Sequence, residues 1–163
     1  IRESKCIDMK KLCIKENEKV WLVFIDIYPI NDFGNLFDAA ALAAIAALKD
    51  AKMPKYDDKT EKVIYEERTK KSLPLTKIPV SCTLIKIGNS IIVDPSIEEE
   101  KAMDARLTVA TLEDETICAL QKGGDSSLDI EDIKTIIDIS IKKSKELRKL
   151  LTWNIQNLKK LGL

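Results

Sequence analysis

An alanine-rich run from Ala39 to Leu48 constrains the fold of this chain more than any other feature. Seven of its ten residues are alanine, which is the strongest helix former and has a very small side chain. From Leu36 to Leu48 the only polar residue is Asp38, so a helix here is apolar on every side. Helices of that kind lie inside a domain and pack on all faces. We therefore predict a buried central helix over residues 36–52, ended by Pro54.

The composition excludes several classes of functional site. The chain contains no histidine, and its four cysteines lack C-x-x-C spacing, which excludes zinc fingers, Ser-His-Asp triads and Cys-His dyads. The cysteines are most simply reduced core residues of a cytoplasmic protein. A net charge of zero at pH 7 argues against nucleic-acid binding by bulk charge and leaves room only for a local basic surface.

Targeting signals are also lacking in the sequence. No apolar run reaches about eighteen residues, so we expect no membrane span and no membrane partner. No secretory signal is visible. The first residue is Ile1 and not methionine, which indicates a fragment or a processed product.

Strand patterns and polar connections flank the predicted helix. Residues 20–28 (VWLVFIDIY) predict a near-continuous apolar strand, typical of a sheet covered on both faces. Asp26 interrupts it, as either a structural or a site-facing carboxylate. Residues 54–62 and 66–72 are predicted to be polar connections, with a short edge strand at 63–65 between them. This region is the best candidate for a subdomain boundary.

The remainder of the chain predicts hairpins and a long helix. The hairpin signals pair residues 80–87 with 90–93 around Gly88-Asn89, and residues 107–112 with 116–120 around an acidic turn. A short acidic connection or helical turn is expected at 97–103. Ser126, Ser127 and Asp129 offer caps for a long helix with a lysine-rich outer face. The predicted class is α+β, with the helices on one side of a mixed sheet.

Three stretches carry candidate chemistry. The loop 34–38 precedes the central helix, where backbone N–H groups can hold a phosphate; a turn with Asp38 as a helix cap is the commoner arrangement. Residues 94–100 (DPSIEEE) follow a strand, where carboxylates can hold magnesium or perform acid-base chemistry, although exposed acidic turns are commoner. The third stretch is basic and has no interleaved aromatic residues, so it is a weak nucleic-acid signal; it comprises Arg2, Lys5, Lys10 and Lys11.

Three blocks of sequence resemble the RNase PH-like family in order and spacing. They are VWLVFIDIYPINDFGNLFDAAALAAIAALKDAKMP, IPVSCTLIKIGNSIIVDPSIEEEKAMDARLTV and ICALQKGG. Within the family the resemblance is closest to the non-catalytic ring subunits of archaeal exosomes, and it covers residues 1–150. It implies an α+β, RNase PH-like fold with ribosomal-protein-like βαβ topology that is incomplete at its N-terminus. Residues 1–75 would be the last portion of the first RNase PH-like region, and residues 76–163 the C-terminal-type subdomain.

The resemblance also implies that the catalytic apparatus is lost. In catalytic members a small residue, an arginine and a threonine in the loop bind the attacking phosphate. That loop falls here on Asn35, Leu36, Phe37 and Asp38, with phenylalanine at the arginine position and aspartate at the threonine position. The acidic pair falls on Asp94, which matches, and on Glu100, which replaces an aspartate. The arginine that would hold the phosphate with two hydrogen bonds is replaced by an aromatic ring. We therefore predict no catalytic residues, no metal and no cofactor.

The implied role is structural and RNA-guiding. Such subunits alternate with a catalytic RNase PH-like homologue in a hexameric ring of three heterodimers, carry RNA-binding cap subunits, and admit single-stranded RNA 3′ end first in the cytoplasm. Arg2 is the one RNA-contacting position carried over. The alternative is a phosphate-dependent 3′→5′ exoribonuclease in its own right that uses Asp94 and Glu100. A third hypothesis, a structural domain without an RNA role, rests only on the neutral net charge.

Overall fold

The computed structural model describes residues 1–160, apart from the side chains of Arg68 and of residues 152–160. A four-stranded sheet forms the larger body, with strand order β6-β5-β7-β8. Its strands are β5 (Val80–Ile87), β6 (Ser90–Val93), β7 (Ala105–Thr111) and β8 (Ile117–Gly123). Every pair is antiparallel. Both predicted hairpins are therefore confirmed, whereas the sheet is antiparallel and not mixed.

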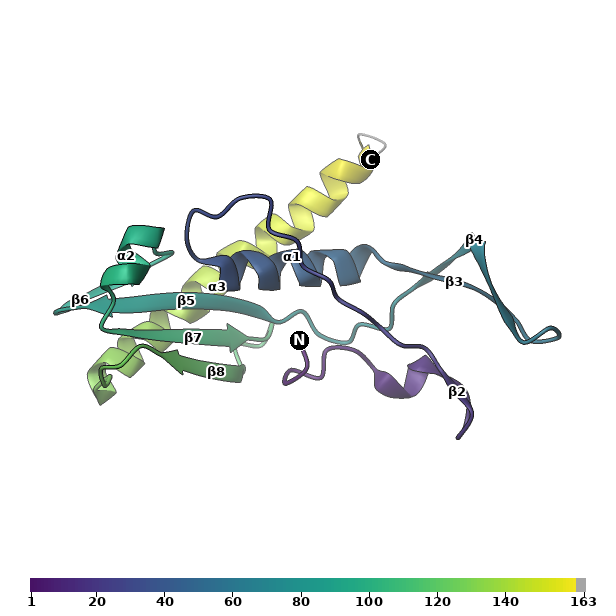
Figure 1. Ribbon diagram of the computed structural model, residues 1–163, viewed down its shortest axis with the longest axis horizontal. Coiled ribbons are helices and arrows are strands. Elements are labelled where there is room, and N and C mark those ends of the chain that lie inside the picture. The colour runs from purple at the N-terminus through teal and green to yellow at the C-terminus, as the bar shows by residue number, and fades with distance from the viewer. Residues whose placement is uncertain (161–163) are drawn as a thin grey trace.

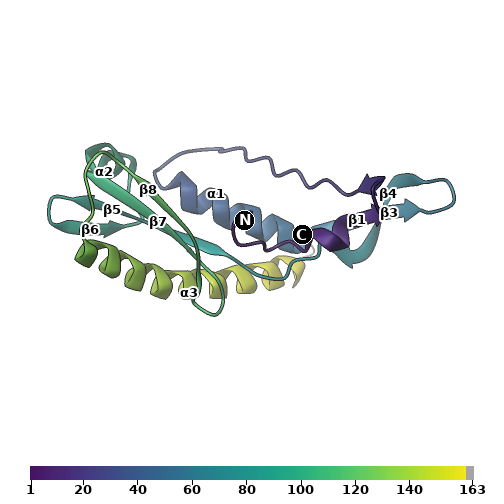
Figure 2. The ribbon, with the colours of Figure 1, turned by 90° about the horizontal axis from the view of Figure 1, so that it is seen from below.

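Two helices pack against the sheet. The long helix α3 (Ile130–Lys160) packs on one face, where Ile136 joins Leu84, Val109 and their neighbours in the main core cluster. Helix α1 (Leu36–Asp50) runs alongside β5, and its Ile45 packs with Leu151 of α3 in a second core cluster (Figure 2). Strand β5 thus contacts both helices.

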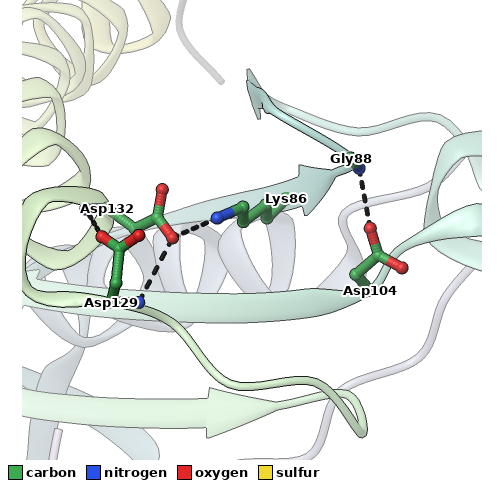
Figure 3. Close-up of polar contacts among 5 residues, drawn as sticks. All are labelled: Lys86, Gly88, Asp104, Asp129 and Asp132. Atoms are coloured by element: carbon green, nitrogen blue, oxygen red, sulfur yellow. Dashed lines mark hydrogen bonds and ion pairs between the residues drawn. The ribbon is translucent and has the colours of Figure 1, made fainter.

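The start of α3 is fastened by a polar cluster (Figure 3). Lys86 on β5 forms an ion pair with Asp132 in the first turn of α3. Asp129 and Asp132 exchange backbone-to-carboxylate hydrogen bonds of 3.3 Å and 2.8 Å. Asp129 is thus the cap among the three predicted candidates. On the adjoining loop, the amide of Gly88 donates to the carboxylate of Asp104 at 2.7 Å.

Helix α1 begins where the alanine-rich run predicts and ends two residues earlier. Only Ala44, Ile45 and Leu48 are buried, so burial on every side is contradicted. The described residues cover a single face of the helix. On its open side a cavity of about 400 Å³ separates Ala43 and Ala47 from the segment 23–28.

The strand predicted at residues 20–28 does not form. Strand β2 (Lys19–Val20) pairs only with β1 (Cys13–Lys15), and residues 21–30 belong to no strand or helix. Phe24, Tyr28 and Ile30 are 79%, 84% and 101% exposed. A strand needs a neighbour for its hydrogen bonds, and no such neighbour lies along residues 21–30 in the described part of the chain. Figure 1 shows this segment passing α1 without regular secondary structure.

The region expected to be two polar connections around a short edge strand at 63–65 is a hairpin, so the strand is confirmed and the connections are not. Strands β3 (Lys52–Asp57) and β4 (Lys62–Ser72) pair antiparallel and project from the body (Figure 1). Their charged residues concealed the strand pattern, because an exposed ribbon needs no apolar face. Two short helices complete the fold: the 3₁₀ helix η1 (Met9–Leu12) and α2 (Ile97–Ala102), whose predicted helical turn is confirmed.

The four cysteines are unpaired thiols. Cys6 and Cys82 are buried as expected, Cys118 is half-buried, and Cys13 is exposed, contrary to the expectation of core positions. Among the described residues, no helix has both the length and the apolar composition that crossing a membrane requires.

Candidate functional site

Asn35 lies at the centre of the candidate site, immediately before α1. Its backbone is left-handed, with φ of 50°, a conformation that asparagine tolerates. Its side-chain amide donates to Asp38 Oδ2 at 3.0 Å and to Asp94 Oδ1 at 2.7 Å. Its backbone N–H donates to Glu100 Oε1 at 2.9 Å. The structure therefore brings together two residues of the predicted phosphate loop, Asn35 and Asp38, and both residues of the predicted acidic pair.

A close backbone approach locks the loop against the segment that carries the acids. Gly34 has φ of 101°, and a Cβ built on it would lie 2.3 Å from the carbonyl oxygen of Pro95. Only glycine fits such a contact. Asp94 itself is exposed and has φ of 56°. The capping box between Ser96 and Glu99 then starts α2, which places Glu100 over the loop.

Asp38 does not cap its own helix, so the cap expectation is wrong. Its carboxylate accepts hydrogen bonds from strand β5: from Thr83 N at 2.6 Å, Thr83 Oγ1 at 3.0 Å and Ser81 Oγ at 2.9 Å. Thr83 Oγ1 also lies 2.9 Å from Thr108 Oγ1 on β7. The aspartate therefore fastens α1 to the sheet, and these donors leave it little capacity for a ligand.

Phe37 makes the other long-range contact of the loop. The Arg106 guanidinium carbon lies 4.3 Å above the centre of its ring, a cation–π contact. Phe37 is 51% exposed. Leu36 is 37% exposed and contributes no polar group.

A cavity of about 540 Å³ adjoins the cluster, between α1, the β5–β6 edge and α3. Asn35, Asp38 and Asp94 line it, and Lys143, which also lines it, is paired with Glu146 at 2.9 Å. Cys82 also lines it. Burial, aided by the charge of Asp38, raises the pKa of the Cys82 thiol to about 12. The cavity thus offers acceptors and a protonated thiol, which suits neither an anion nor thiolate chemistry.

The other sequence candidates lie apart from this cluster. The Arg2 side chain is 97% exposed and lies 3.9 Å from Glu3. With Lys5 and Lys10 it lines a separate cavity beside the exposed segment 21–25. Asp26 is exposed and lines the cavity at the open side of α1. Within the described residues, no group of three or more Cys, Asp or Glu side chains could hold a metal ion.

Sequence reasoning missed Ser81, Thr83, Thr108 and Arg106. Hydroxyl side chains at alternating positions of an otherwise apolar strand, as at Ser81 and Thr83, are a usable signal for a polar layer. Arg106 gave no such signal, because its partner Phe37 lies in a different element far along the chain.

The sequence matches two profiles of one family. Residues 1–54 match the 3′ exoribonuclease family, domain 1, and residues 77–143 match the 3′ exoribonuclease family, domain 2. The chain belongs to the 3′ exoribonuclease (RNase PH) family. Membership confirms the predicted RNase PH-like, α+β fold and the resemblance stated from the sequence.

Close relatives within the 3′ exoribonuclease family are archaeal exosome proteins. The chain is 42% identical over 147 residues to a protein named exosome complex component Rrp42 from Methanothermobacter thermautotrophicus, covering 90% of this chain and 54% of the relative. It is similar to a chain of the structure titled Archaeoglobus fulgidus exosome with RNA bound to the active site (TM-score 0.80, 43% identity, 91% of this chain and 56% of the other). It is also similar to a chain of an archaeal exosome core (TM-score 0.82, 42% identity, 93% and 59%). The chain thus spans somewhat more than half the length of these relatives.

Proposed function

We propose that this chain is a non-catalytic, structural and RNA-guiding subunit of a ring-shaped 3′→5′ exoribonuclease complex of the exosome type. Its relatives carry the name of an exosome component, which supports the assembly. The hydrogen bond from Asn35 N to Glu100 is the main observation that supports a non-catalytic role. A backbone donor of the loop that would face a phosphate is already occupied by a carboxylate of the same chain.

The electrostatics of the site support the same conclusion. Three carboxylates, those of Asp38, Asp94 and Glu100, accept hydrogen bonds from Asn35. Phosphorolysis requires an attacking phosphate, and donors and cations must hold it. The Phe37 ring stands where the resemblance places the phosphate-binding arginine. Such a site repels the co-substrate of the reaction, although Asp94 keeps the exposed position of a vestigial acid.

The proposed partners follow from the relatives. A catalytic homologue would alternate with this chain in a hexameric ring of three heterodimers in the cytoplasm, with RNA-binding cap subunits on one side. Single-stranded RNA would enter 3′ end first. Arg2 remains the proposed RNA-contacting residue, and its full exposure supports this role. Residues 1–75 and 76–163 would form two regions, a division that the separate family matches at 1–54 and 77–143 support.

Co-expression with a catalytic homologue that retains the arginine-containing loop tests the proposal. The two chains should co-purify and together shorten single-stranded RNA in phosphate and magnesium. The homologue alone should be less active, because it lacks this chain's share of the ring. Failure to co-purify would reject the ring-subunit role. If the catalytic homologue degrades RNA equally well with and without this chain, that result would favour a structural domain with no RNA role.

A further inference from the structure

The pair formed by Phe37 and Arg106 has features that its structural role does not require. Phe37 lies in the first turn of α1, and Arg106 lies on β7. The guanidinium covers one face of the ring at 4.3 Å, yet the phenylalanine remains 51% exposed. A ring placed only to fix the helix on the sheet would lose more of its surface, since burial is what stabilises an aromatic side chain.

Arg106 is held in place without a carboxylate partner. It stands opposite Gly123 on β8, and a Cβ on that glycine would lie 2.7 Å from an Arg106 terminal nitrogen. The arginine therefore rests on bare backbone beneath and on the ring above. Its buried Nε has no hydrogen-bond partner in the described residues, and no ion pair involves it there. A half-buried arginine normally finds a carboxylate or phosphate fork.

The strand positions beside the pair carry small or neutral side chains. On the face of β7 that carries Arg106, the next residues are Thr108 and Ala110, and their partners on β8 are Gln121 and Ala119. All four side chains are neutral, and none is bulky. A planar group lying over the ring would meet no large side chain from these strand positions.

We propose that Phe37 and Arg106 form a stacking platform for one nucleotide of single-stranded RNA. The open face of the ring stacks a base, which is sequence-tolerant because every base has a π-face. The guanidinium donates to the adjoining phosphate, an interaction of charge-assisted, bidentate geometry. In the loop that leads to α1, Phe33 is also exposed, at 88%. This platform rests on the proposed RNA-guiding function and gives that function a contact residue outside the basic N-terminal segment.

Binding of a fluorescein-labelled oligoadenylate to the full chain, measured by anisotropy, tests the platform. Phe37→Ala should weaken binding about 5- to 150-fold, the range of one lost base–aromatic stack. Phe37→Tyr should restore it, and Arg106→Gln should weaken binding and reduce its salt dependence by the equivalent of one phosphate. Tyr65→Ala is the matched control, because Tyr65 is a 74% exposed aromatic on the β3–β4 hairpin. It should bind like the wild type.

A second readout does not depend on the stability of the Phe37→Ala variant. In Phe37→Trp, stacking of oligoadenylate should quench the new indole fluorescence, whereas an abasic ribose-phosphate oligomer or inorganic phosphate should not. Wild-type affinity in Phe37→Ala and Arg106→Gln overturns the platform, and so does binding of polyglutamate in place of RNA at Arg106. If these variants leave RNA binding unchanged while the chain still assembles with a catalytic homologue, only the platform fails. If assembly itself fails, the proposed function fails.

Discussion

Asn35 and Asp94 are 59 positions apart, yet the side-chain amide of Asn35 donates a 2.7 Å hydrogen bond to Asp94 Oδ1. The same amide nitrogen donates to Asp38 Oδ2 at 3.0 Å. One neutral group thereby holds two carboxylates together without a cation. Hydrogen bonds within the chain thus join the loop before α1 to the turn after β6.

Asn35→Ala should destabilise the chain by about 1.5–3 kcal/mol, because hydrogen bonds to charged groups are of that size and Asn35 is almost fully buried. Urea unfolding followed by circular dichroism measures the change. The control is Asn31→Ala, at an exposed asparagine of the preceding loop, which should shift the midpoint little. Equal stability of the two variants would contradict the bridging role.

The wild-type loop should bind neither phosphate nor sulfate. A phosphate about 4 Å from Asp38 would cost on the order of 4 kcal/mol per unit of like charge at an effective dielectric constant near 20. The attraction of an anion to the helix N-terminus offsets only about 0.3–1 kcal/mol of this repulsion, or about 2 kcal/mol in a partly buried site. Repulsion dominates, and isothermal titration calorimetry with phosphate should show no heat of binding at this loop.

The double variant Phe37→Arg/Asp38→Thr should gain measurable anion binding without gaining catalysis, because Glu100 still alters the acidic pair. It should also unfold at lower urea, since Asp38 no longer accepts the hydrogen bonds of Ser81 and Thr83. Phosphate titration of the double and wild-type chains gives the comparison. An anion seen against the backbone of residues 35–38 in wild-type crystals would refute the repulsion argument.

The ion pair between Lys86 and Asp132 should make stability depend on pH. The hydrogen bond from Lys86 lowers the pKa of Asp132 below its ordinary value of 3.8. Stability from this group is therefore complete above about pH 4 and is lost as pH falls through the lower folded-state pKa. The hydrogen bond to Asp132 raises the pKa of Lys86 above 10.5, so its contribution persists below that value and is lost as pH rises past it.

Urea midpoints measured from pH 2 to 8 for the wild type, Asp132→Asn and the exposed control Asp138→Asn test this pH dependence. Asp132→Asn should be less stable than the wild type at pH 7 and should show less change on acidification. Parallel pH profiles for all three proteins would show that the ion pair does not titrate with folding.

The exposed apolar segment should drive self-association of the isolated chain, or dependence on a partner. Leu22 and Phe24 are 71% and 79% exposed on a stretch without strand partners, and contiguous apolar surface of this kind marks interfaces or aggregation. Leu22→Lys and Phe24→Glu should reduce the associated mass and dye binding several-fold, whereas Tyr65→Glu should not. Light scattering that shows a monomer of the wild type at high concentration, without dye binding, would count against this prediction.

Local patterns determined what the sequence could predict. The hairpin at Gly88-Asn89 and helix α1 follow from turn chemistry and helix propensity, which act over a few residues. The strand expected at 20–28 depends on a neighbouring strand that the described residues do not provide. The β3–β4 hairpin was missed because a solvated ribbon needs no apolar alternation.

The residues of the candidate site likewise fall into those that the sequence could predict and those that it could not. The resemblance indicated Asn35, Asp94 and Glu100, and the structure places them in contact. The anchoring of Asp38 by Thr83 and the contact of Phe37 with Arg106 could not be predicted, because both depend on how α1 lies across the sheet. Expecting a cap at Asp38 was reasonable for an isolated helix and fails once strand β5 competes for the carboxylate.

The most direct test of the central claim is phosphate-dependent release of nucleoside diphosphates from single-stranded RNA by this chain alone, in magnesium. The engaged loop and the surrounding carboxylates predict no release above background, for the wild type and for Asp94→Ala alike. Release by the wild-type chain that Asp94→Ala abolishes would contradict the claim, and would establish a phosphorolytic exoribonuclease that uses Asp94 and Glu100.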